Sequence, residues 1–176
     1  MLISKKMNSA INQQIGNEFG ASLQYVAIAA HFGGEGLSAL AAHFYLQAEE
    51  ERDHAMRFVR YVVDAGGRVE IPTITSPRAT FKNVADAVRL ALNHEMTVTS
   101  QINKLVDLAI KESDHITRDM LSWFIREQLE EVSSMDNLLK VVQRAGESNL
   151  IHVEDYLTRA HGRTARMADE AGGDET

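Results

Sequence analysis

Cysteine is absent from the 176 residues of this chain, and proline is nearly absent. Without cysteine the protein has no disulfides, no cysteine-ligated zinc site and no thiolate-bound iron centre. A small extracellular fold held together by disulfides is therefore excluded. The two prolines, Pro72 and Pro77, lie in one short region and leave long uninterrupted segments on either side.

Long apolar runs are also missing. No stretch approaches the roughly 20 consecutive apolar residues of a membrane-spanning helix, so we expect no membrane segment. Residues 1–6 lack the apolar core of a signal peptide. These absences together predict a cytoplasmic protein.

Basic residues are outnumbered by acidic ones. Lys and Arg total 18 against 25 Asp and Glu, which gives a net charge of −7. Because a nucleic-acid-binding domain normally carries a basic face, we expect no nucleic-acid partner. The acidic balance is compatible with the binding of cations.

The abundant residues are good helix formers, mainly Ala, Leu, Glu, Gln, Lys and Arg. Hydrophobic residues make up 44% of the chain, enough for a sizeable core. The sequence therefore predicts an all-α domain, with four long helices and a short fifth one. Their expected limits, set by capping residues and glycines, are 4–32, 37–65, 83–111, 116–144 and 149–161.

The segment 68–82, which holds both prolines, predicts the topology. A helix of 29 residues is about 44 Å long, and 15 extended residues can reach about 50 Å. This segment can therefore cross the bundle from end to end and make the second and third helices parallel. We expect one domain over residues 1–163 and a disordered tail over residues 164–176, which are small, polar and glycine-containing.

Each long helix carries an acid on its apolar face. Hydrophobic residues recur in alternating steps of three and four, the spacing of helices packed in a bundle. His54 lies three residues after Glu51 and shares its face, and Gln128 precedes Glu131 at the same spacing. The acids on the four apolar faces are Glu18, Glu51, Glu95 and Glu131.

Burying four carboxylates in one core is costly. One unpaired buried carboxylate costs several kcal/mol, and four would approach the whole stability of a domain, about 5–15 kcal/mol. Bound cations are one explanation, and carboxyl groups that stay protonated are the alternative. Two divalent ions would balance four carboxylates. Oxygen ligands with one imidazole, from His54, suit iron or manganese, with zinc also possible.

Three stretches together resemble the bacterial non-haem ferritins: EFGASLQY at 18–25, EERDHA at 50–55 and WFIREQLEE at 123–131. The resemblance extends over about residues 1–163, crossover and fifth helix included. It implies a ferritin-like four-helix bundle with one long crossover. It also implies that the short fifth helix packs at the four-fold axes of a hollow shell.

The resemblance implies a role for each matching residue. One iron site corresponds to Glu18, Glu51 and His54. A second corresponds to Glu95, Glu131 and the bridging Glu51, with Gln128 beside it. Tyr25 corresponds to a tyrosine next to the centre, hydrogen-bonded to a ligand or donating an electron. A third iron site, on the inner side, corresponds to Glu50, Glu127, Glu130 and Glu131.

The implied function is iron storage by a ferroxidase, which oxidises Fe(II) with O2 or H2O2 and deposits ferric mineral inside a 24-subunit homo-oligomeric shell. No haem is expected, because Arg52 stands where haem-binding bacterioferritins carry a ligating Met. The fourth helix also has Gln128-x-x-Glu131 where those proteins have a second Glu-x-x-His. The alternatives are a di-iron or di-manganese oxidase or catalase without storage, a haem bacterioferritin, and a structural bundle or non-catalytic shell subunit.

Overall fold

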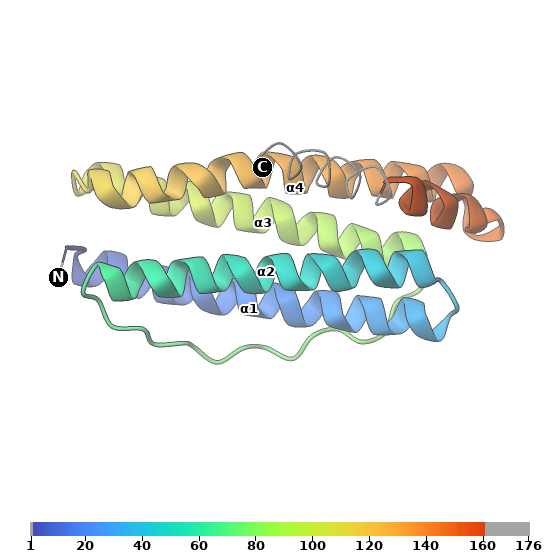
Figure 1. The fold of residues 1–176 in the computed structure, drawn as a ribbon, viewed down its shortest axis with the longest axis horizontal. Coiled ribbons are helices and arrows are strands. Elements are labelled where there is room, and N and C mark those ends of the chain that lie inside the picture. Colours follow the sequence, from blue (N-terminus) through green and yellow to red (C-terminus); the bar gives the residue numbers. More distant parts are fainter. Residues whose placement is uncertain (1, 161–176) are drawn as a thin grey trace, which may run out of the picture.

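The computed structural model of the chain describes residues 2–160 and is built from helices (Figure 1). A short 3-10 helix, η1 (Glu147–Asn149), precedes a last helical stretch over residues 151–160. The predicted all-α fold with a short fifth helix is confirmed. The tail expected over residues 164–176 lies outside the described residues. The four long helices are α1 (Lys5–Gly34), α2 (Ser38–Asp64), α3 (Val84–Lys111) and α4 (His115–Ala145).

Side-chain caps explain where most of these helices begin. Ser4 accepts a hydrogen bond from the backbone N–H of Met7 at 2.9 Å, and Asn83 accepts one from that of Asp86 at 2.8 Å. Such caps satisfy N–H groups that have no partner within the helix. Asp114 caps α4 in the same way, and this helix begins one residue earlier than predicted.

The residue that precedes helix α2, Leu37, gives it no side-chain cap. Its first N–H groups are satisfied from the other end of the chain instead. The carboxylate of Glu154, in the last helix, accepts from the N–H of Ala39 at 2.8 Å and of Leu40 at 2.9 Å. This contact ties the last helix to the start of α2.

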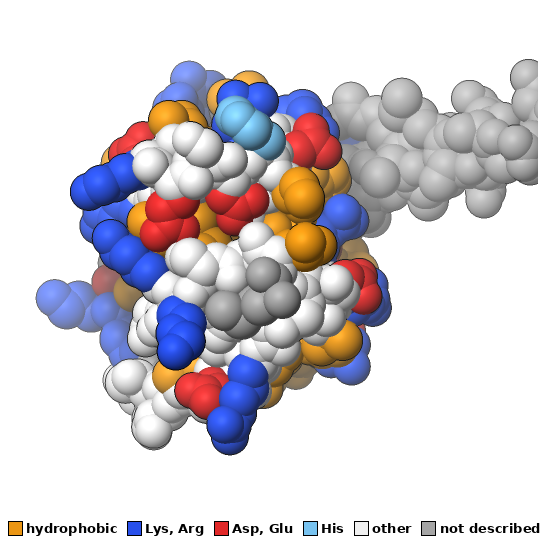
Figure 2. Space-filling model, turned by 90° about the vertical axis from the view of Figure 1, so that its left-hand side faces the viewer, with side chains coloured by type: hydrophobic (Ala, Val, Ile, Leu, Met, Phe, Trp, Pro, Cys, Tyr) orange, Lys and Arg blue, Asp and Glu red, His pale blue; other side chains and the backbone are white. Residues whose placement is uncertain are grey.

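The crossover between α2 and α3 runs along the whole bundle (Figure 1). It follows that α2 and α3 are parallel, as the sequence predicts, while α1 and α2 form one antiparallel pair and α3 and α4 the other. None of the described helices is long and apolar enough to cross a membrane. Acidic and basic side chains are interspersed on the end of the bundle where α1 begins (Figure 2).

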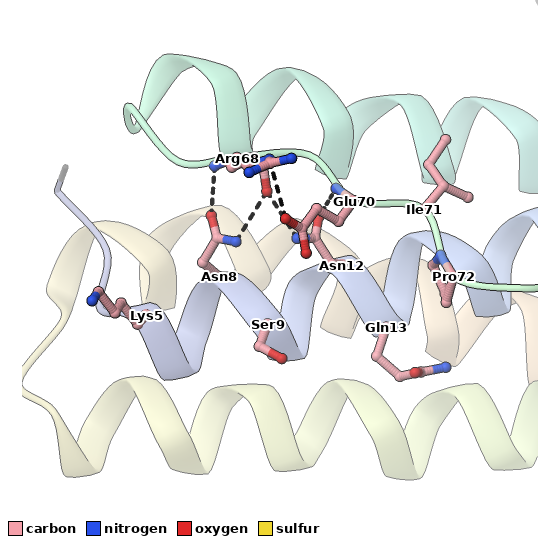
Figure 3. Close-up of a pocket in the computed structure, with 9 residues that line it drawn as sticks. All are labelled: Lys5, Asn8, Ser9, Asn12, Gln13, Arg68, Glu70, Ile71 and Pro72. Atoms are coloured by element: carbon pink, nitrogen blue, oxygen red, sulfur yellow. Dashed lines mark hydrogen bonds and ion pairs between the residues drawn. The ribbon is translucent and has the colours of Figure 1, made fainter.

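The crossover is fastened to α1 by amide side chains (Figure 3). Asn8 and Asn12 both donate to the backbone carbonyl of Arg68, at 3.0 and 2.8 Å, and Asn8 accepts from the Arg68 N–H at 2.9 Å. Gly16 allows the close approach, because a Cβ there would lie 2.8 Å from Cδ of Pro72 and closer still to Cγ. The crossover is therefore held directly against α1.

The hydrophobic core has two parts, one towards each end of the bundle. The first takes its buried residues from 25–32, 40–48, 84–91, 135–142 and the last helix. The second takes them from 3–15, 58–65, 98–109 and 121–124. On every long helix a gap separates the two sets, and all four gaps lie at one level of the bundle. The acids that the sequence places on apolar helix faces fall in these gaps.

Candidate metal centre

Six polar side chains meet at the level between the two cores. Each helix contributes, and every one of the six is at most 6% exposed. The apolar residues of both cores hold this level in place, because a helix whose apolar face is buried at both ends must bury what lies between. The six are Glu18 from α1, Glu51 and His54 from α2, Glu95 from α3, and Gln128 and Glu131 from α4.

Glu18, Glu51 and His54 form one compact group. Each offers one ligand atom, and these atoms all lie within 4.8 Å of one another. His54 Nδ1 lies 3.5 Å from Glu51 Oε2. Two carboxylates and an imidazole at this spacing can hold one divalent cation between α1 and α2.

A second compact group consists of His54, Glu127 and Glu131, whose ligand atoms also lie within 4.8 Å of one another. Glu127 is half-buried, and it approaches the centre from α4. Glu95 and Gln128 lie outside both groups. The expected second site, with Glu51, Glu95 and Glu131 as its ligands, therefore stays a prediction.

Unpartnered carboxylate oxygens test whether the centre suits cations. The Oε2 atoms of Glu18, Glu51 and Glu95 are buried and have no hydrogen-bond partner in the described part of the chain. The ion pairs among the described residues bring no Lys or Arg to them. A buried oxygen without a partner is costly, and a bound cation removes that cost. The donor set fits two divalent ions.

Burial changes the acid–base behaviour of the centre. Loss of solvent, with Glu95 close by, raises the pKa of Glu18 to about 7. Loss of solvent, with Glu95, Glu50 and Glu127 close by, raises the pKa of Glu131 to about 8. Loss of solvent, with Glu18 and Glu95 close by, holds the pKa of Glu51 well above its usual range. Without a cation, Glu18 is about half protonated at neutral pH and Glu131 is mostly protonated.

The pKa of His54 shifts in the opposite direction. Burial, helped by the positive charge of Arg57, lowers the pKa of His54 to about 4. Its imidazole is therefore neutral at physiological pH, the form that binds a metal. The guanidinium of Arg57 lies 3.8 Å from the centre of the Trp123 ring, and that ring meets His54 edge to face at 5.4 Å.

Tyr25 is fully buried and donates a hydrogen bond to Glu95 Oε1. Burial and the charge of Glu95 raise the pKa of Tyr25 well above its usual range, so the phenol keeps its proton. Thr99 donates to Gln128 Oε1 at 2.9 Å. Tyr25 and Gln128 thus lie beside the centre, where the sequence places them.

The expected inner site lies partly outside the buried level. Glu50 and Glu130 are exposed, and Glu127 is half-buried. Desolvation and the charge of Glu127 raise the pKa of Glu50, and desolvation and the charge of Glu130 raise that of Glu127. The three acids therefore lie close enough to influence one another. The ligation of iron by these residues stays a prediction.

Two residues that hydrogen-bond to side chains of the centre were not predicted from the sequence. Gln14 donates to Glu18 Oε1 at 2.9 Å, and the Thr99 hydroxyl lies 2.9 Å from both Gln128 Oε1 and the backbone carbonyl oxygen of Glu95, which share its one proton. Each lies four residues from an acid of the centre on the same helix, so an i, i+4 search around each acid could have found them.

Comparison with known proteins identifies the family to which the chain belongs. Residues 8–145 match the model of the ferritin-like domain family. The chain is 45% identical to Ferritin BfrB of Mycolicibacterium smegmatis over 99% of its own length and 92% of that protein. It is 30% identical to the bacterial non-heme ferritin of Staphylococcus aureus over 86% of its own length and 92% of that protein.

Among solved structures, an open pore ferritin from Archaeoglobus fulgidus superimposes with a TM-score of 0.86 at 31% identity, over 88% of this chain and 97% of that one. The sequence comparisons, the fold and the buried Glu and His cluster thus all indicate the same family. The chain belongs to the ferritin family of iron-storage proteins.

Proposed function

We propose that this chain is a ferroxidase that oxidises Fe(II) to Fe(III) with O2 or H2O2 and stores the product as ferric mineral inside a 24-subunit shell. The observation that carries the proposal is the set of buried, unpartnered carboxylate oxygens on Glu18, Glu51 and Glu95. These oxygens come from three different helices and meet at one level. A bound cation would give each of these oxygens a partner.

Fe(II) is the substrate of this centre. Glu18 and Glu51 bind it through carboxylate oxygens, and the neutral imidazole of His54 supplies a nitrogen ligand. Binding displaces the protons that the buried carboxyls carry at neutral pH. An anionic set of ligands stabilises Fe(III) more than Fe(II), and it thereby favours loss of an electron from bound iron.

The redox step balances over two irons. Each Fe(II) loses one electron, and the two electrons with two protons convert O2 to H2O2 or H2O2 to two waters. The protein holds both irons where one oxidant can reach them. Tyr25 keeps Glu95 oriented through its hydrogen bond, and its phenol is in a position to donate a further electron.

Ferric iron then leaves towards the inner acids. His54 belongs to both compact groups, so it connects the Glu18 and Glu51 pair with Glu127 and Glu131. Glu50 and Glu130 extend the acidic path from there as the expected third site. Hydrolysis of Fe(III) with release of protons yields the mineral.

Assembly into a shell is supported by the family, whose members form oligomeric shells, and by apolar side chains on the surface. Leu23 and Val26 of α1, and Tyr45 and Leu46 of α2, are between 42 and 54% exposed. Exposed apolar side chains of this kind are typical of subunit interfaces. We expect them to be covered by neighbouring copies of the chain.

Aerobic Fe(II) titration tests the proposal, with the iron counted in the particle that elutes from size-exclusion chromatography. Wild type should elute as a large shell that holds far more than two irons per chain. Glu51→Ala with His54→Ala should assemble but lose fast oxidation. Glu49→Ala with Asp53→Ala, two exposed acids of the same helix, is the matched control and should behave as wild type. A wild-type particle of one subunit, or one limited to a few irons per chain, would contradict storage.

A further inference from the structure

A groove of about 340 Å³ lies beneath the crossover, between α1 and α3. Residues 73–77 of the crossover form one side, and Gly16 and Gly20 of α1 and His94 and Gln101 of α3 lie opposite. The described residues that line it bear amides, hydroxyls, apolar groups and one imidazole, and none is Asp, Glu, Lys or Arg. The groove is therefore polar but carries no fixed charge.

One line of hydrogen bonds leads from this groove to the metal centre. Asn17, which lines the groove, donates to Gln14 Oε1 at 3.3 Å. Gln14 Nε2 donates both to Gln101 Oε1, on the other side of the groove, at 3.2 Å and to Glu18 Oε1 at 2.9 Å. Gln14 is 2% exposed, so this single side chain connects the groove lining to a ligand of the centre.

A second line passes through His94. Its ring meets the ring of Tyr25 edge to face, with centroids 6.1 Å apart, and Tyr25 in turn donates to Glu95. His94 Nε2 is buried and has no hydrogen-bond partner among the described groups. In a polar cavity, such an orphaned atom normally marks the position of a bound water or another small polar molecule.

The chemistry of the groove lining determines which molecules can pass through the groove. Fe(II) is a hydrated dication, and its transfer into a partly enclosed site without carboxylates is costly. A neutral molecule that both donates and accepts hydrogen bonds finds partners at every step: the Asn17 and Gln101 amides, the Gln14 amide and His94. Of the two oxidants of the proposed reaction, H2O2 has this character and O2 does not.

We propose that the groove beneath the crossover is the passage by which H2O2 reaches the centre and water leaves it, with Gln14 as its inner gate. This inference rests on the proposed ferroxidase function. The reaction served is the cleavage of the peroxide O–O bond. Two bound Fe(II) supply two electrons, two protons come from solvent, and two waters return through the groove.

Gly20 offers a way to block the passage without touching the ligands. A Cβ at this position would lie 3.7 Å from Cγ2 of Ile74, an ordinary contact. Gly20→Ala therefore leaves the groove open, whereas the larger side chain of Gly20→Leu fills it. Both changes replace a helical glycine, so Gly20→Ala is the matched control. Gln14→Leu, which closes the inner gate with a side chain of similar size, is the second variant.

The experiment is a single turnover in stopped flow. Protein loaded anaerobically with two Fe(II) per chain is mixed with H2O2 and, separately, with O2. Gly20→Leu should slow the peroxide reaction at least about tenfold relative to Gly20→Ala, with a much smaller effect on the O2 reaction. Anaerobic Fe(II) binding should be the same in both variants. Gln14→Leu should show the same preference for slowing the peroxide reaction.

The contrary outcomes are separable. If wild type oxidises no Fe(II) with either oxidant, the proposed function is wrong, and so is the proposed passage. If wild type is active and Gly20→Leu reacts with peroxide as fast as Gly20→Ala, only the passage is wrong. Equal slowing of the two oxidants, or loss of Fe(II) binding in Gly20→Leu, also contradicts the passage. If Gly20→Leu does not fold, Gln14→Leu gives the decision in the same assay.

Discussion

Anaerobic binding of Fe(II) should expel protons from the centre, and their number should depend on pH. At about pH 6.5, a carboxyl with a pKa of about 7, that of Glu18, is roughly three-quarters protonated, and one with a pKa of about 8, that of Glu131, is almost fully protonated. Burial and the charges of Glu18 and Glu95 raise the pKa of Glu51 as well. His54 is neutral at this pH and releases none, because its pKa is about 4. Binding of two Fe(II) should therefore release close to two protons per chain from Glu18 and Glu131 together.

At about pH 8.5 the expected release is smaller. Glu18 is then almost fully ionised, and Glu131 keeps only about a quarter of its proton. The release should fall to roughly half of its value at the lower pH or less. Glu18→Gln should lower the release at about pH 6.5 by a little under one proton and leave that at about pH 8.5 almost unchanged.

The assay is anaerobic titration of metal-free protein in weak buffer, with a pH indicator or a pH-stat. Addition of Fe(II) to the buffer alone is the blank. A release that is close to zero at both pH values would refute the reasoning, because it would mean that the carboxyls are ionised before the metal arrives. An equal release at both pH values would refute the assignment of the two titrating groups to Glu18 and Glu131.

Three further predictions concern stability. First, a raised carboxyl pKa stabilises the fold at low pH and loses this effect as pH rises through the folded-state pKa. The metal-free protein should therefore lose stability, and melt at lower temperature, as the pH rises from about 6.5 towards the folded-state pKa values of about 7 and about 8. The loss is up to about 1.4 kcal/mol per pH unit for each such carboxyl and levels off above those values, while bound metal should flatten the curve. The lowered pKa of His54 acts only below that window. Second, Glu154→Ala should lower the free energy of unfolding by about 1 kcal/mol, because it removes the cap of α2. Asp155→Ala, at an exposed neighbouring residue, should lower it by less. Melting curves that rank the two variants the other way would contradict the cap. Third, Gly20→Ala should stabilise the protein by up to about 1 kcal/mol in denaturant unfolding. Gly16→Ala should destabilise the protein, because its Cβ would overlap the Pro72 ring. Equal effects of the two substitutions would contradict the close contact between Gly16 and Pro72.

The helices and the candidate ligands could be predicted from the sequence because both depend on local order. The step of three and four residues places Glu18, Glu95 and Glu131 on apolar faces, and Ser4 and Asn83 act as the expected caps. A helical period is a property of consecutive residues, so it is visible without knowledge of the packing.

Contacts between distant segments could not be predicted in the same way. The cap of α2 by Glu154 joins residues more than 110 positions apart. The approach of Glu127 to His54 depends on how α4 is rotated against α2. The fifth helix was predicted to begin at Asn149, but this residue ends η1 and the helical stretch follows from residue 151. Gly146, at a positive φ of 68°, turns the chain there, and the first turn is tighter than an α-helix.

The most direct test of the central claim is the initial rate of aerobic Fe(II) oxidation in Glu51→Gln and Glu49→Gln. The first change removes a buried carboxylate of the centre, and the second removes an exposed one two residues away on the same helix. We expect Glu51→Gln to slow oxidation by at least about tenfold, while it still folds and assembles, and Glu49→Gln to match wild type. If Glu51→Gln oxidised Fe(II) as fast as wild type, the centre between the two cores would not be the site of oxidation.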